Sequence, residues 1–214
     1  MKRVLLAMSL MIAGCGASTI AVGPMVTGAG STGAEPAVMR TAVVHVEAFT
    51  RRAGGKDGCD VGIGKTGMFN ERARIVTEQP VDVIVTQGMR TRLTEAGASV
   101  VAKDAAAYVI RGSVEEFRAE EYVTGISPEH ASARVRFDVI VRNRAGKVVW
   151  AGTGDATATS PPTWNDATEF DGETLRVALA SALDKVVGDG SFWKAITQAP
   201  DAADAPSAPV APAS

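Results

Sequence analysis

The sequence is poor in the residues on which catalysis and metal binding usually depend. Its 214 residues include only two histidines and two cysteines. His45 and His130 stand far apart, and no group of His, Cys or acidic residues has the spacing of a metal site. The Gly-x-Ser-x-Gly elbow of many hydrolases is also missing. The sequence therefore predicts a protein that is not an enzyme and that needs no metal or cofactor.

Aromatic residues, net charge and long apolar runs are scarce as well. Aromatics make up 5% of the chain, so its core should consist mainly of aliphatic side chains. The formal charge of −2 offers no electrostatic basis for binding nucleic acid. The apolar run over residues 4–13 is too short to cross a membrane as a helix, which requires about 20 apolar residues.

The first fifteen residues, MKRVLLAMSLMIAGC, have the layout of a secretory signal: a basic start, an apolar run and small residues. Their end, Ile-Ala-Gly-Cys, resembles the lipobox of bacterial lipoproteins, which implies cleavage before Cys15 and lipid attachment to its sulfur. The alternative is an ordinary secretory signal with an incidental cysteine. Loss of Lys2 and Arg3 would leave 20 basic residues (22 − 2) against 24 acidic ones, a formal charge of −4. Gly16, rather than an acidic residue, follows the cysteine, which resembles outer-membrane lipoproteins in enteric-type sorting. This resemblance implies the outer membrane, facing the periplasm, rather than the inner membrane.

Composition divides the chain into four parts. Residues 1–14 are the expected lipoprotein signal peptide. Residues 15–40, rich in Gly, Ala, Ser and Thr, are the expected flexible tether from lipidated Cys15. Residues 41–198 should form a single domain, and the Pro/Ala-rich residues 199–214 are predicted to be disordered.

The stretch DGCDVGIGKTG, residues 57–67, is reminiscent of a phosphate-binding loop because it contains Gly-Lys-Thr. The Walker A motif needs a glycine at position 59, which is Cys59, and no helical pattern follows. We therefore expect no nucleotide, and we interpret residues 50–72, including the Gly-rich segment 54–67, as a mobile loop. Cys59 would be the only free cysteine: a small buried residue, an intermolecular bridge, or a thiol exposed on this loop, which the surrounding glycines favour.

Periodicity predicts the elements of the domain. Strands are expected over residues 42–49, 106–122, 131–143 and 147–160, with a tight turn at residues 143–146. Gly112 is a candidate β-bulge. Helical spacing begins at Pro80 and stops at Gly97, and a second helix is expected over residues 172–187. The order β-α-β-β-β-α predicts an α+β two-layer sandwich, in which a largely antiparallel four-stranded sheet carries both helices on one face.

A basic stripe lies on the polar face of the strand over residues 131–143. It contains Arg134, Arg136, Arg142 and Arg144. One interpretation is solubility and cross-strand pairing with Glu115 or Asp155. The other is a contact surface for an acidic partner or for lipid headgroups.

These features together resemble the YajG-like family of bacterial envelope lipoproteins. The resemblance rests on IAGC, VVHVEAFTRR, VGIG, PVDVIVTQGMRTRLTEAGASVV, AAYVIRGSVEEF and ARVRFDVIVRNRAGKVVWAGTG, and it covers about residues 43–197. The family tends to have an Asp near the end of the first strand, which is absent here. Membership would imply a small lipid-anchored domain without an established activity.

The sequence therefore predicts a lipid-anchored, non-enzymatic binding or accessory module for a cell-envelope complex, with an envelope protein as partner. The alternative is an auxiliary lipoprotein that binds a small or lipidic ligand between sheet and helices, as in a transport system. That alternative requires an apolar cavity lined by Val85, Met89, Phe137 and Leu179, and a filled core there would count against it.

Overall fold

The computed structural model describes residues 19–20, 42–52, 58–66, 71–122, 130–162 and 168–197. Cys15, the expected signal peptide over residues 1–14 and the Pro/Ala-rich residues 199–214 lie outside the described residues. The elements, in chain order, are β1 (Thr19–Ile20), β2 (Val43–Val46), β3 (Thr50–Arg51), β4 (Asp60–Thr66), β5 (Glu71–Thr77), α1 (Val81–Glu95), β6 (Ser99–Val100), the 3-10 helix η1 (Lys103–Ala105), β7 (Tyr108–Tyr122), β8 (His130–Asn143), β9 (Val148–Thr159), α2 (Thr168–Val187) and α3 (Gly190–Thr197).

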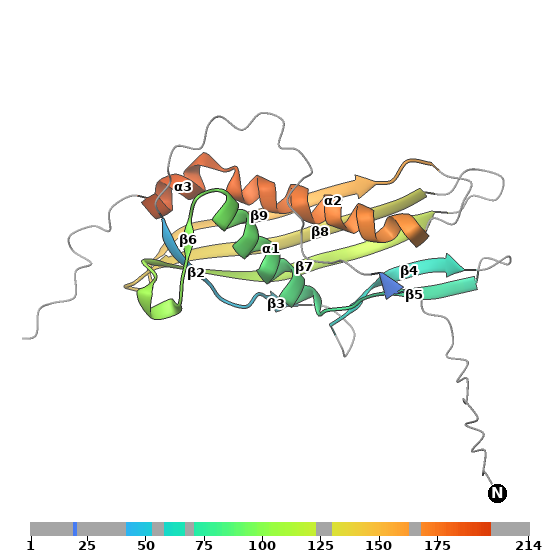
Figure 1. The fold of residues 1–214 in the computed structure, drawn as a ribbon, viewed down its shortest axis with the longest axis horizontal. Helices are drawn as coiled ribbons and strands as arrows, with labels where there is room; N and C mark the ends of the chain where they lie inside the picture. Colours follow the sequence, from blue (N-terminus) through green and yellow to red (C-terminus); the bar gives the residue numbers. More distant parts are fainter. Residues whose placement is uncertain are drawn as a thin grey trace, which may run out of the picture.

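The nine described strands form one mixed sheet (Figure 1). Its centre is the long antiparallel meander β7-β8-β9. Along the other edge of β7 run three short parallel strands in succession, β2, β3 and β4. β6 pairs with β2, β5 pairs antiparallel with β4, and β1 pairs with β5. β2, β3 and β4 therefore follow one another along the same side of β7.

The strict alternation predicted for β8 is confirmed. Its inward residues are buried, namely Ala131, Ala133, Val135, Phe137, Val139 and Val141. The predicted hairpin to β9 is also present, with Gly146 at a φ of +80°, a conformation that glycine adopts without steric cost. One face of the meander therefore carries the core, and the other face is open to solvent.

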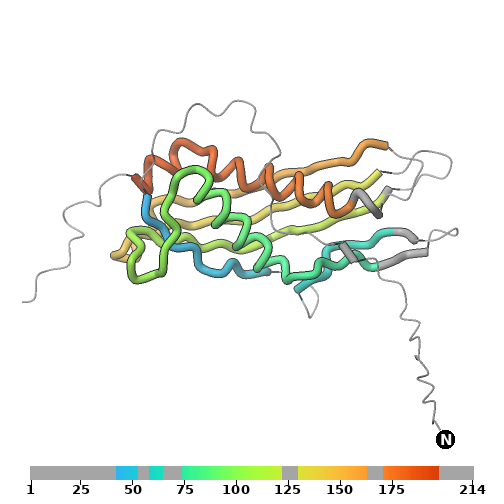
Figure 2. Tube along the Cα trace, viewed as in Figure 1, coloured from blue at the N-terminus to red at the C-terminus, as the bar shows by residue number. Residues whose placement is uncertain are grey.

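Both long helices cover the core face, as expected (Figure 2). α1 ends before Gly97, which has a φ of +92°, as the sequence predicted. α2 buries the predicted stripe along its length: Leu175, Leu179, Ala182, Leu183 and Val186. No helix within the described ranges is long and apolar enough to cross a membrane.

The predicted four-stranded, largely antiparallel sheet is wrong in strand number and order. The described part of the chain holds nine strands, and those along one edge of β7 are parallel to it. Three of the additional strands, β1, β3 and β6, have only two residues each. Such short strands carry no alternating pattern, because their hydrogen bonds come from neighbours distant in sequence rather than from a local preference. Thr19–Ile20, within the expected tether, belong to this group.

The interpretation of residues 50–72 as a mobile loop is also wrong for the part that the structure describes. Asp60–Thr66 form β4, which pairs with both β5 and β7. The need for glycine at position 62 has a steric reason: a Cβ there would lie 1.9 Å from the Ala119 carbonyl oxygen of β7. The residues 53–57 and 67–70 lie outside the described residues.

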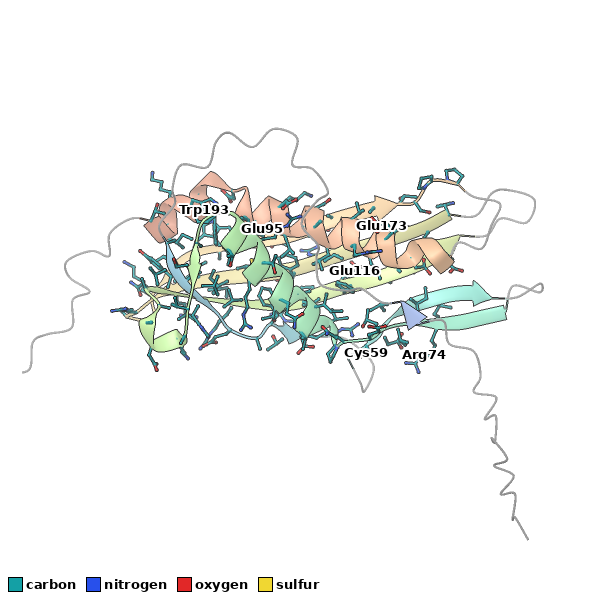
Figure 3. All side chains as sticks on the ribbon, viewed as in Figure 1. Cys59, Arg74, Glu95, Glu116, Glu173 and Trp193 are labelled. Atoms are coloured by element: carbon teal, nitrogen blue, oxygen red, sulfur yellow. The ribbon has the colours of Figure 1, made fainter. Side chains whose placement is uncertain are left out.

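Cys59 lies at the base of the β4–β5 hairpin, near Arg74 of β5 (Figure 3). The side chain is half-buried rather than exposed on a loop. The backbone carbonyl oxygen of Cys59 accepts hydrogen bonds from the backbone N–H of Thr77, at 2.9 Å, and from the Thr77 hydroxyl, at 3.2 Å. The backbone of Cys59 thus belongs to the hairpin.

Gly112 does not mark a bulge. The register of β7 against β8 shifts between Val114 and Glu116 instead. Gly112 makes room for the Phe49 ring, which would lie 2.0 Å from a Cβ at this position. Alternation along a strand over residues 42–49 would place Phe49 on the face opposite Val44 and Val46, but the strand ends at Val46 and Phe49 is buried in the same core.

The C-terminal helix α3 covers one end of the core. Phe192, Trp193 and Ile196 are buried, and the Trp193 indole N–H donates to the Val187 carbonyl. Asp189 caps this helix, since its Oδ1 accepts from the Ser191 backbone N–H at 2.7 Å. That hydrogen bonding to Ser191 lowers the pKa of the Asp189 carboxyl.

Candidate functional site

The solvent-exposed face of the meander carries charged side chains in rows across the strands. The register places Glu116 of β7, Arg136 of β8 and Asp155 of β9 side by side. Nearer the β8–β9 turn, the rows consist of basic and apolar side chains instead. This end of the sheet also lies beside the segment that joins β6 to β7 (Figure 2).

A surface hollow of about 620 Å³ lies at this end of the sheet. We refer to it as the basic hollow. Its lining comes from η1 and the residues after it, from β7 and from the β8–β9 turn: Lys103, Asp104, Ala106, Val109, Arg111, Arg142, Asn143, Arg144 and Gly146. Four of these side chains are cationic, although the chain as a whole is slightly acidic.

Two arginines of the basic hollow are held by backbone carbonyls rather than by carboxylates. Arg142 Nη1 donates to the Gly146 carbonyl at 2.7 Å. Arg144 Nε donates to the Ala106 carbonyl at 3.0 Å, and its Nη2 donates to Ala105 at 3.4 Å. A carbonyl fixes the position of a guanidinium group without neutralising its charge, so both arginines keep a full positive charge at defined places.

The other two cations share one carboxylate. Lys103 Nζ lies 2.8 Å from Glu47 Oε1, and Arg111 forms an ion pair with the same carboxyl group. The hydrogen bond from Lys103, followed by that from Arg111, lowers the pKa of Glu47, although partial burial acts in the opposite direction. Glu47 therefore stays ionised at neutral pH and compensates one of the two charges.

Apolar side chains adjoin the cations. Val109 lines the basic hollow and pairs with Arg142 across the strands. Ile140 follows on β8, opposite Arg111, and is 39% exposed. Val43 on β2 and Val148 on β9 are also exposed on this end of the sheet. The basic hollow thus combines positive charges at defined positions with apolar side chains around them.

The predicted stripe of four arginines divides into two groups in the structure. Arg142 and Arg144 reach the basic hollow. Arg134 is neutralised by Glu116, at 3.2 Å, and by Asp155, at 3.4 Å. Arg136 forms no ion pair or hydrogen bond with the residues that the structure describes. Pairing with Asp155 agrees with the sequence, whereas the second carboxylate is Glu116 rather than Glu115, although the strand register places Glu116 opposite Arg136.

Sequence reasoning missed two members of the site, Lys103 and Arg111. Lys103 lies in a 3-10 helix after a two-residue strand, and Arg111 lies on a strand more than thirty residues before Arg144. Neither belongs to a motif. The only available signal was the alternation along β7, which places Arg111 on the polar face.

The described residues contain no group of three or more His, Cys, Asp or Glu side chains that could hold a metal ion. His45 has a structural partner, because its Nδ1 lies 2.9 Å from the Val101 carbonyl oxygen. Cys15, the predicted lipidation site, lies outside the described residues.

Comparison of the chain with protein-family models and with curated proteins finds no match. Among solved structures, the chain is similar to protein XCC0632 from Xanthomonas campestris, of the DUF330 family. The TM-score is 0.52 at 16% identity, over 73% of this chain and 85% of that one. It is also similar to a minor lipoprotein from Acinetobacter baumannii, with a TM-score of 0.41, 14% identity, and coverage of 73% and 93% of the two chains.

At this level of identity, the similarity to the Xanthomonas protein indicates a shared fold and nothing about activity. The similarity to the Acinetobacter protein is weaker and carries no part of the argument. Because no family model matches, membership of the YajG-like family stays a prediction.

Proposed function

We propose that this protein is a lipid-anchored, non-enzymatic module of the bacterial cell envelope that holds an acidic group of an envelope partner in the basic hollow. The observation that carries the proposal is the charge of that hollow. Four cations face two carboxylates, Glu47 and Asp104, which is a formal excess of two positive charges (4 − 2) on an acidic chain. Such a local reversal of charge attracts anionic partners.

The chemistry of the basic hollow supports binding rather than catalysis. Arginine does not give up its proton under ordinary conditions, so Arg142 and Arg144 cannot act as a general base. Both are also immobilised by carbonyls, which suits a fixed docking point. The lipidation signal at Cys15 would keep the module at a membrane surface. Gly16 supports the periplasmic face of the outer membrane.

The alternative of a ligand between sheet and helices finds no support at the residues it requires. Val85, Met89, Phe137 and Leu179 are each fully buried and belong to one core cluster. These side chains fill the space between the described parts of the sheet and the two helices. We therefore place the binding function on the outer face of the sheet.

The anchor has a direct test in Cys15→Ser. We expect the wild-type chain to incorporate labelled palmitate and to sediment with membranes when expressed in a bacterium. Cys15→Ser should lose the label, because a hydroxyl cannot replace the thiol in lipid transfer. Cys59→Ser is the matched control and should keep both properties. Label on Cys15→Ser at the wild-type level would contradict the anchor.

The docking function is tested with a pair of charge variants and affinity capture from envelope extracts. An envelope component captured by the wild-type chain should be lost with Arg142→Gln/Arg144→Gln, which removes the two uncompensated charges. Arg136→Gln removes a cation from the same strand outside the basic hollow and should capture the component as well as the wild type. Equal recovery by all three chains would show that the basic hollow is not the docking point.

A further inference from the structure

We propose that the group held in the basic hollow is a phosphate, carried by a lipid headgroup or present as a free anion. This inference rests on the proposed function and specifies the chemistry of its ligand. The formal excess of two positive charges corresponds to the charge of about −1.5 to −2 on a phosphate monoester at neutral pH. A phosphate diester carries one negative charge, so it would leave one positive charge of the basic hollow unmatched.

The arrangement of donors favours phosphate over carboxylate. A carboxylate offers two acceptor oxygens, whereas a phosphate monoester offers three and can therefore pair with two guanidinium groups at once. Arg142 and Arg144 each use only part of their N–H donors on backbone carbonyls, so both retain donors for a ligand. Lys103 and Arg111 already share a carboxylate, that of Glu47. The uncompensated pair would thus receive the ligand.

The basic hollow is also preorganised. The three hydrogen bonds to Ala105, Ala106 and Gly146 tie the guanidinium groups to the backbone of η1 and of the β8–β9 turn. Asn143, between the two arginines, is itself buried and accepts from the Lys147 backbone N–H at 3.0 Å. Because the side chains are ordered before binding, less conformational entropy is lost when the anion arrives.

Size and surround suit a phosphate that carries a substituent. A volume of about 620 Å³ lies within the range of small-molecule sites and is much larger than a bare phosphate ion requires. Val109 within the hollow and Ile140 beside it offer apolar contact to the rest of such a ligand. A phospholipid could meet both, since its phosphate carries negative charge and its acyl chains supply the apolar contact.

The experiment is a titration of the full-length, isotope-labelled chain in non-ionic detergent, followed by nuclear magnetic resonance at constant ionic strength. Inorganic phosphate and short-chain phosphatidylglycerol are the two probes, chloride is the reference anion, and a poly-glutamate peptide supplies carboxylates. We expect saturable shifts in the side-chain N–H signals of Arg142 and Arg144 and in the Ala105–Ala106 amides. Arg142→Gln/Arg144→Gln removes both pairing groups and should weaken binding about ten-fold or more, since the loss of one charge-assisted pair alone would account for about ten-fold.

Two further variants separate charge from geometry and from folding. Arg136→Gln should bind phosphate within about two-fold of the wild type. Arg142→Lys/Arg144→Lys keeps both charges but loses the planar fork, so its affinity should fall between those of the wild type and the glutamine variant. If the glutamine variant fails to fold, the lysine variant provides the same comparison.

The outcomes distinguish the two sources of the phosphate, and they test the phosphate inference separately from acidic docking. Tighter binding of phosphatidylglycerol than of inorganic phosphate would support a lipid headgroup, and the reverse would support a soluble phosphorylated molecule. Shifts with poly-glutamate and none with phosphate would overturn the phosphate inference and leave acidic docking intact. Absence of shifts with every probe, or shifts that survive in Arg142→Gln/Arg144→Gln, would overturn both.

Discussion

Replacing Phe137 with alanine is expected to destabilise the domain by about 3–5 kcal/mol, which is the usual cost of truncating a buried phenylalanine. Phe137 is fully buried in the middle of β8. The Phe49 ring packs edge-to-face against it, with 5.9 Å between the ring centroids. On the other side, the ring occupies the space left by Gly154 of β9, directly opposite in the sheet. Its removal would leave a cavity between the sheet and α2.

Urea unfolding measures this effect, with Trp150 and Trp193 as fluorescent reporters close to Phe192 in the core. A loss of 3–5 kcal/mol is a large share of the roughly 5–15 kcal/mol that stabilises a domain of this kind. Ile140→Ala is the matched control, because it lies on the same strand but faces solvent. It should change stability by about 0.5 kcal/mol or less. Similar losses for both variants would contradict the description of the core.

The second large effect is expected from Gly62→Ala, which should detach the β4–β5 hairpin from β7. A Cβ at residue 62 would lie 1.9 Å from the Ala119 carbonyl oxygen, a separation that no rotamer can relieve because both atoms belong to the backbone framework. β4 must therefore move away and lose its pairing with β7. Overpacking of this kind typically costs about 1–3 kcal/mol, and a backbone clash falls at the upper end.

Hydrogen exchange and thiol reactivity can locate the damage. The amides of β4 and β5 should exchange faster in Gly62→Ala, whereas those of β8 should keep their protection, since the meander does not depend on the hairpin. The half-buried Cys59 thiol should react faster with a thiol reagent, because the hairpin base that holds it would open.

Gly64→Ala is the control within the same strand. Its Cβ would meet the Glu121 carboxylate at 2.9 Å, the far end of a flexible side chain that can move aside. We expect protection of β4 and the reactivity of Cys59 to stay close to wild type. Equal damage from both substitutions would show that β4 tolerates no side chain at either glycine, and the close approach at Gly62 would then not be the specific cause.

The candidate site could be anticipated only in part. Alternation along residues 131–143 correctly places Arg134, Arg136 and Arg142 on one face. The sequence cannot show which of them keep their charge, because this depends on carboxylates that arrive from other strands. Glu116, which the register places opposite Arg136, pairs diagonally with Arg134. Arg142 and Arg144 instead meet carbonyls and keep their charge.

Residue order alone predicts the elements that bury a face through their own period: the alternating strand β8, its hairpin with β9, and the apolar stripes of α1 and α2. Tertiary structure alone decided the glycine-rich strand β4, the two-residue strands and the basic hollow. The physical reason is the origin of their stabilising contacts. β4 depends on backbone hydrogen bonds along the edge of β7, and the cations of the basic hollow come from segments that are distant in sequence, including Lys103, Arg111 and Arg142. No local pattern records such contacts, since they exist only after the chain has folded.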